Sequence, residues 1–300
     1  MVSRDDEVFD SLIESLISEY LDFNPLLGTY LGLHEYDPLM PNLSRDRFEY
    51  AIKRLEWYLD KFKSIDRERL TGSRKIDYEP IIRGIGEFLI LTRDWPTWRM
   101  YPIGFDIVGR ALFSILIRDH LPMEHRLFSL YSRVKGIEKA IMDSLNNVDE
   151  PYTLWLDYTA MSGKGLPHLL NVIKRFGEKF ENKELIDACE RAVEVITKGL
   201  ERLKDLRTRA KPGFKPIGME LFKKLLRARF IEEDFDALRV HGYREAEKYR
   251  ALMEREVAEL PPLENVKIVE TPEFMRPIIP FAAYIQPEVL SWSFRDRNLH

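Results

Sequence analysis

The most constraining feature of this sequence is the spacing of its apolar residues, which recur every three or four positions over long stretches. The clearest stretch holds, in order, Leu185, Cys189, Val193, Ile196, Leu200 and Leu203. This alternation places one apolar stripe along a helix, and such a stripe is typical of a helix buried against an antiparallel neighbour. The chain should therefore be built from amphipathic helices that pack together.

The same periodicity extends over most of the chain. It predicts helices over about 3–21, 44–65, 73–94, 105–118, 122–145, 151–176, 185–203, 217–226 and 235–260. Ser3 followed by Asp6 has the pattern of a capping box at the first helix start. In the sixth segment, 162–165 (Ser-Gly-Lys-Gly) is expected to interrupt the helix rather than form a phosphate-binding loop, because no strand precedes it.

The end of the chain differs from the rest. Residues 266–269 (Val-Lys-Ile-Val) are the one convincing strand, and the following residues, 271–280, hold too many prolines for a helix. We therefore predict an all-α fold: a multi-helix antiparallel, bundle-like array with one short strand and an irregular proline-rich C-terminal tail. The 300 residues can bury a large core.

The expected domain organisation follows from these patterns. Residues 1–262 should form a helical domain, with 1–180 and 181–262 as candidate subdomains, and 263–300 should form an extended C-terminal segment. The part of this tail from 266 to 290 is apolar, so we expect something to cover it, either a missing catalytic half or a second copy of the chain.

Composition excludes several classes of protein. The net charge is −4, the N-terminus lacks the apolar core of a signal peptide, and uncharged runs fall short of the ~18 residues of a membrane span. We expect a cytoplasmic protein with no membrane partner. Cys189 is the single cysteine, which excludes an internal disulfide, and one Gln among 46 basic and 50 acidic residues is typical of a thermophilic source.

The segment 23–38 combines two prolines, two glycines and three aromatic rings with the polar residues His34, Glu35 and Asp37. This density favours a packed, shaped connection rather than a linker. We predict a set of substrate-lining or shape-setting residues, none of them catalytic: His34, Glu35, Asp37, Trp95, Trp98, Tyr101 and Tyr284. The alternative for His34 and Asp37 is that they satisfy buried backbone groups within their own turn.

No metal-binding motif is present in the sequence. None of the six histidines begins His-Glu-x-x-His, and His34-Glu35 has no second histidine four residues beyond the first. His241 and Glu245 are expected on a solvated helix face, although their spacing would let them share a cation. His120 and His125 are expected to cap a helix or lie at the surface, with metal binding as the less favoured alternative. We therefore predict no metal ligand and no cofactor in this chain.

One stretch favours an anionic partner. Residues 198–229 contain eleven Lys or Arg against three acids. No stacking aromatics interleave them, so nucleic-acid binding is not favoured. The stretch leaves open an alternative function, a self-sufficient helical interaction module that binds a protein or anionic partner.

A series of short motifs resembles one known family. They are Pro25-x-x-Gly28-Thr29-x-x-Gly32-x-His34-x-x-Asp37, 74–78, Trp95 with Tyr101-Pro102, Ile217-Gly218-x-Glu220-Leu221-Phe222-x-x-Leu225-Leu226, and Thr271-Pro272-Glu273-Phe274 leading to 280–284. In this order they resemble the N-terminal part of the bacterial and archaeal family catalogued as domain of unknown function 885. Its members look like distant relatives of helical zinc metallopeptidases.

The resemblance implies a mostly helical protein with a deep substrate cleft. Full-length members carry a His-Glu motif, closed by Pro-Gly-His, in their C-terminal half, where zinc would promote peptide-bond hydrolysis. This sequence reaches His300 without such a complete motif. The expectation is a non-catalytic N-terminal portion that forms one wall of the cleft. Its expected partner is a peptide-like substrate or a missing C-terminal catalytic half, and the sequence leaves open whether the natural protein continues beyond residue 300.

Overall fold

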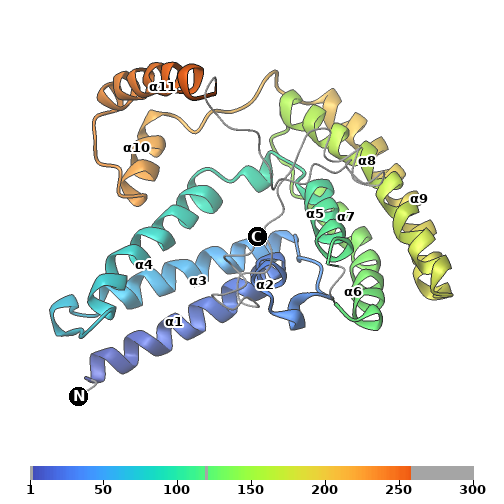
Figure 1. Ribbon diagram of the computed structural model, residues 1–300, viewed down its shortest axis with the longest axis horizontal. Helices are drawn as coiled ribbons and strands as arrows, with labels where there is room; N and C mark the ends of the chain where they lie inside the picture. Colours follow the sequence, from blue (N-terminus) through green and yellow to red (C-terminus); the bar gives the residue numbers. More distant parts are fainter. Residues whose placement is uncertain (1–2, 119–120, 258–300) are drawn as a thin grey trace.

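The computed structural model describes residues 3–118 and 121–257. These residues form helices joined by short connections, and no sheet occurs among them (Figure 1). The only strand-like pairing in this part of the chain is an isolated parallel bridge between Tyr152 and Lys211. The predicted all-α helical array is thus confirmed.

One group of helices forms the N-terminal side of the array. In it, α1 (Arg4–Phe23), α3 (Arg45–Lys63) and α4 (Arg74–Leu89) lie side by side (Figure 1). Their core is made by Phe9, Tyr58, Phe62, Ile65, Leu70, Ile85 and Leu89. The predicted capping box starts α1: the backbone N–H of Asp6 donates to Ser3 Oγ (3.1 Å), and the N–H of Ser3 donates to Asp6 Oδ2 (2.9 Å).

The second group forms the larger core. It comprises α5 (Gly104–Leu116), α6 (Met123–Lys135), α7 (Ile137–Asn146), α8 (Thr153–Lys179) and α9 (Lys183–Thr208). The predicted stripe of α9 lies in this core, where Leu185, Cys189 and Ile196 are almost completely buried. Residue 180, the expected subdomain boundary, lies between α8 and α9 in the chain, and these two helices pack against each other. The division into two subdomains stays a prediction.

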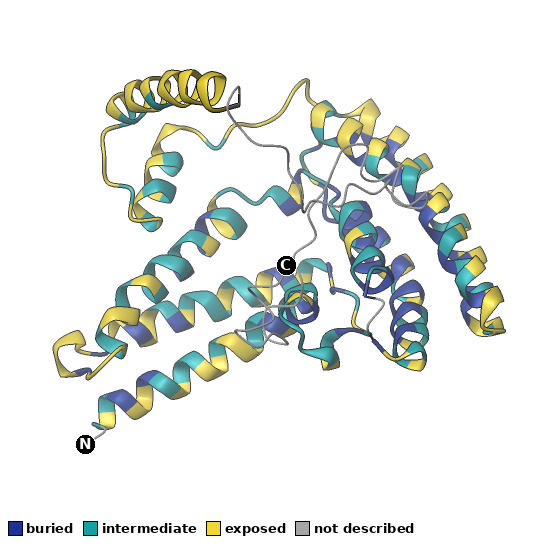
Figure 2. Cartoon of the chain, in the orientation of Figure 1, coloured by how far each residue is buried: buried dark blue, intermediate teal, exposed yellow. Residues whose placement is uncertain are grey.

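The last two described helices lie outside both cores. They are α10 (Met219–Ala228), in which no residue is buried, and α11 (Phe235–Val257), whose residues are almost all exposed (Figure 2). Nowhere in residues 3–118 and 121–257 does a helix combine the length and apolar character that a membrane crossing requires.

The helix predicted over 122–145 is broken, contrary to expectation. It forms two helices, α6 and α7, which meet at Gly136. A Cβ at this position would lie 2.6 Å from Cβ of Met40, which belongs to the connection that follows residues 23–38. The chain therefore needs glycine where α6 and α7 approach this connection.

The interruption predicted at 162–165 is absent, which is a second correction. Helix α8 runs through Gly163 and Pro167 without a break. A Cβ on Gly163 would lie 2.7 Å from Leu200 and 2.8 Å from Phe105, so this glycine permits close packing against α5 and α9 rather than ending the helix. The predicted strand at 266–269 and the segment 263–300 lie outside the described residues.

Candidate functional site

Residues 23–38 are more regular than the sequence indicated. Pro25 occupies the first turn of a short helix, α2 (Pro25–Leu31), which ends at Gly32 in a left-handed conformation (φ 85°). A single 3-10 turn, η1 (His34–Tyr36), follows, and Asp37 closes it by donating its backbone N–H to the carbonyl of His34 (3.1 Å). This tight sequence of turns holds His34 and Asp37 on the same side of the segment.

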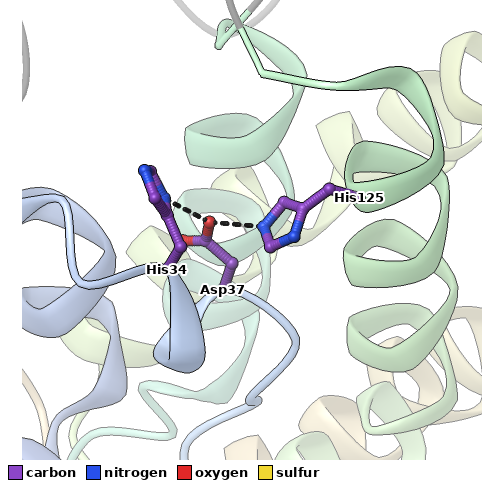
Figure 3. Close-up of side chains that lie close together, drawn as sticks. All are labelled: His34, Asp37 and His125. Carbon is purple, nitrogen blue, oxygen red and sulfur yellow. Dashed lines mark hydrogen bonds and ion pairs between the residues drawn. The ribbon is translucent and has the colours of Figure 1, made fainter.

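The structure brings His34, Asp37 and His125 together (Figure 3). Asp37 Oδ2 lies 3.0 Å from His34 Nδ1 and 2.8 Å from His125 Nε2, which comes from the first turns of α6. The Asp37 side chain is fully buried, whereas the histidines are 40% and 30% exposed. The cluster therefore has a fixed inner carboxylate and two outer imidazoles in reach of solvent.

The buried side chain of Arg133 holds residues 29–36 in place through hydrogen bonds. Arg133 of α6 donates to Thr29 Oγ1 (2.6 Å), to Ser114 Oγ (2.8 Å), and to the backbone carbonyls of Tyr36 (3.4 Å) and Ala111. Burial lowers the pKa of Arg133 to about 10, although the nearby negative charge of Asp37 acts in the opposite direction. The guanidinium stays charged at neutral pH and ties α2, α5 and α6 together.

A large cavity opens beside α2, with a volume of about 1180 Å³. Its walls come from α1, α2, the connection after η1, the start of α3, the end of α4 with the segment that follows it, and α5. Among the apolar lining residues are Phe23, Leu27, Tyr30, Phe88, Ile107 and Phe113. The polar lining residues include Arg110 and Arg118, whereas the described lining contains no histidine and no carboxylate, so the cavity itself does not fit a zinc ion. Its size and character suit an apolar ligand.

The other predicted site residues do not belong to this cluster. Glu35 is exposed. Trp98 stacks on Phe48 with ring centroids 4.8 Å apart, and its Nε1 donates to the carbonyl of Thr92 (2.8 Å), so it is a core residue. Trp95 is partly buried in the connection just before it.

Tyr101 belongs to a separate aromatic group. Its ring contacts Trp155 and Tyr158, and burial raises the pKa of its hydroxyl. Among the described ring contacts and hydrogen bonds of Trp95, Trp98 and Tyr101, none joins them to His34 or Asp37. Tyr284 lies outside the described residues.

Two residues of the site were missed from sequence. From the sequence, capping or a surface position is favoured for His125 over metal binding, and no sequence pattern singles out Arg133. Asp37 and His125 are 88 residues apart in the chain, so no local spacing could have joined them.

The basic stretch 198–229 is partly neutralised by acids from other segments. Lys211 and Lys215 both pair with Glu150 and lower the pKa of its carboxyl group to about 2. Similarly, Arg207 pairs with Asp157, and Arg229 pairs with Glu87 at 2.6 Å. On α10, Lys223 and Lys224 are exposed.

This chain is similar in fold to part of a longer protein of known structure. No family model matches the chain, and no curated protein matches its sequence. Among solved structures, it is similar to a "putative lipoprotein of unknown function" from Shewanella oneidensis, with a TM-score of 0.65 and 16% sequence identity. The match covers 92% of this chain and 51% of that one, so this chain spans about half the length of the protein that it resembles. At this identity the similarity shows the fold alone.

Proposed function

We propose that this chain is the helical, N-terminal and non-catalytic portion of a zinc metallopeptidase-like protein, and that it forms one wall of a substrate cleft. The cavity beside α2 carries the proposal, because it is large, mostly apolar and lined by the segment whose motif most resembles the family. A longer protein with this fold exists, because the chain spans about half the length of the Shewanella protein that it resembles, and this is compatible with the proposal.

In this function the residues of the cavity bind and orient, and they do no covalent chemistry. Leu27, Ile107 and Phe113 would receive apolar side chains of a peptide-like substrate and exclude water from it. A C-terminal half would hold zinc, which polarises a carbonyl and activates water. The absence of His-Glu-x-x-His from this sequence is the reason for assigning the reaction to that half.

A binding experiment tests the cavity. We expect a fluorescein-labelled tetrapeptide with central leucine and phenylalanine to bind the purified chain, as measured by fluorescence anisotropy. Ile107→Trp should weaken binding because the larger side chain fills the cavity. Ile76→Trp is the matched control, since Ile76 is 73% exposed on α4. Equal binding by the two variants would contradict the proposal, and so would hydrolysis of the peptide by this chain.

The genomic DNA tests the rest. The coding sequence should continue past codon 300 into a segment with a His-Glu motif closed by Pro-Gly-His. A stop codon directly after His300 would remove the proposed catalytic half. The cytoplasmic location and the thermophilic source stay predictions, which cell fractionation and thermal unfolding would test.

A second candidate function is favoured by one observation. Lys223, Lys224 and Arg227 are exposed on α10, which has no buried residue. This surface could bind an acidic protein or another anionic partner, and such binding should weaken with added salt. Loss of binding in a Lys223→Glu, Arg227→Glu variant would support this function, whereas unchanged binding would contradict it.

A further inference from the structure

We propose that His34, Asp37 and His125 form a binding site for one divalent transition-metal ion, with Zn²⁺ as the simplest occupant. This site is separate from the zinc that the resemblance implies for a C-terminal half. It does not depend on the proposed function, because none of the three residues lines the cavity.

The three side chains have the chemistry of metal ligands. Two imidazoles and one carboxylate are a common ligand set for Zn²⁺, and they also suit Fe²⁺. Each of the three residues offers one ligand atom, and these atoms all lie within 4.8 Å of one another. An ion held by three protein ligands keeps a further position for water or another small ligand.

The distances from Asp37 Oδ2 to the two histidine nitrogens are close to those between the ligand atoms of a bound ion. Tetrahedral Zn²⁺ with ligands at ~2.0–2.1 Å places neighbouring ligand atoms ~3.3 Å apart. Asp37 Oδ2 is 3.0 Å from His34 Nδ1 and 2.8 Å from His125 Nε2, so each pair must open by a few tenths of an ångström. His34 Nδ1 and His125 Nε2 both contact Asp37 Oδ2, so the two nitrogens face one place (Figure 3). These two nitrogens lie within 4.8 Å of each other, and their separation has to shorten towards ~3.3 Å when an ion binds.

The burial of Asp37 gives a second, independent observation. Its side chain is fully buried, yet Oδ1 has no hydrogen-bond partner among the described residues. A buried carboxylate oxygen without a donor costs free energy, and a cation held by both carboxylate oxygens of Asp37 would offset that cost. The histidines are partly exposed, which gives an ion a route from solvent.

The surroundings hold the carboxylate in place. Arg133 donates to Thr29 and to the carbonyl of Tyr36, so it fixes both the helix before the turn and the residue before Asp37. A carboxylate ligand whose backbone is restrained in this way loses little freedom on binding an ion. The site therefore has a rigid inner ligand and two adjustable outer ones.

The test is metal binding by the full chain without a histidine tag. After removal of bound metal with a chelator, Zn²⁺ should bind with a stoichiometry of one by isothermal titration calorimetry, and Co²⁺ should give visible absorption bands. His34→Ala and His125→Ala should each weaken binding by at least ~10-fold. The matched control is His168→Ala, an exposed histidine on α8, which should bind as tightly as the unaltered chain.

Folding is monitored in parallel. His34→Gln and His125→Gln keep a polar side chain at half-exposed positions, and their circular dichroism should match that of the unaltered chain. Added Zn²⁺ should raise the thermal midpoint of the unaltered chain and of His168→Ala, but not of the Gln variants. No binding at 100 μM Zn²⁺, or binding that His125→Ala and His168→Ala weaken equally, would overturn the proposal.

Discussion

Replacing Gly28 with alanine tests whether the turn that carries Asp37 is as tightly packed as the structure shows. Gly28 lies within α2, and a Cβ there would be 2.5 Å from Cδ2 and 2.8 Å from Cβ of Tyr36. These distances are shorter than any van der Waals contact. The Tyr36 side chain cannot retreat by rotation alone, because its own Cβ is one of the atoms in conflict.

The magnitude follows from two opposing effects. Alanine in a helix gains about 0.5–1 kcal/mol over glycine. Overpacking in a tight site costs about 1–3 kcal/mol, so the net destabilisation by Gly28→Ala should reach up to about 2.5 kcal/mol. Gly84→Ala is the matched control within α4, because a Cβ there meets nothing within 4 Å and only the helix gain remains.

Urea unfolding followed by circular dichroism measures both variants. The difference in free energy of unfolding between them isolates the overpacking at Tyr36, about 1–3 kcal/mol. Gly28→Ala should also weaken Zn²⁺ binding, since displacing Tyr36 moves Asp37. If the two variants were equally stable, the turn would be soft and the argument for a rigid inner ligand would be lost.

Three further predictions concern buried polar groups. Arg133→Met should lower the free energy of unfolding by about 3–5 kcal/mol in urea titrations, because it leaves Asp37 without its buried counter-charge and Thr29 without its donor. Hydrogen bonds from Ser3 and Thr71 lower the pKa of Asp6, so its stabilisation is present above the unfolded pKa of ~3.9 and is lost as pH falls towards the folded value; the difference in urea midpoint between the unaltered chain and Asp6→Asn should shrink below about pH 4. Burial raises the pKa of the Cys189 thiol to about 12, so a thiol reagent at pH 8 should label it only after urea is added.

The helices were predictable because their signal is local. Apolar spacing and the Ser3 capping pattern depend only on residues a few positions apart, and α1, α4 and α9 formed close to the expected bounds. The two errors both involve glycine. Gly136 lies against Met40, and Gly163 lies against Leu200 and Phe105, and all three neighbours are distant in sequence. The sequence around a glycine therefore does not distinguish a helix break from a close approach between helices.

The site was half predictable for the same reason. His34 and Asp37 stood out because polar residues crowd one short segment, and the structure does place them together. His125 and Arg133 reach them from α6 through tertiary packing that no spacing encodes. The conspicuous Trp98 became a core residue, since a large aromatic ring gains more from burial against Phe48 than from exposure in a connection.

Thr29 sits between two arginines, with its hydroxyl accepting from Arg133 and its carbonyl accepting from Arg118 at 2.9 Å. Only the first of these contacts depends on the identity of the side chain. In diverged relatives, position 29 should therefore keep a small hydroxyl residue wherever an arginine stands at 133, and the two should be replaced together or not at all. Serine should be able to replace threonine at position 29. Valine has the same shape as threonine but no hydroxyl, so it should occur only in relatives that lack an arginine at 133.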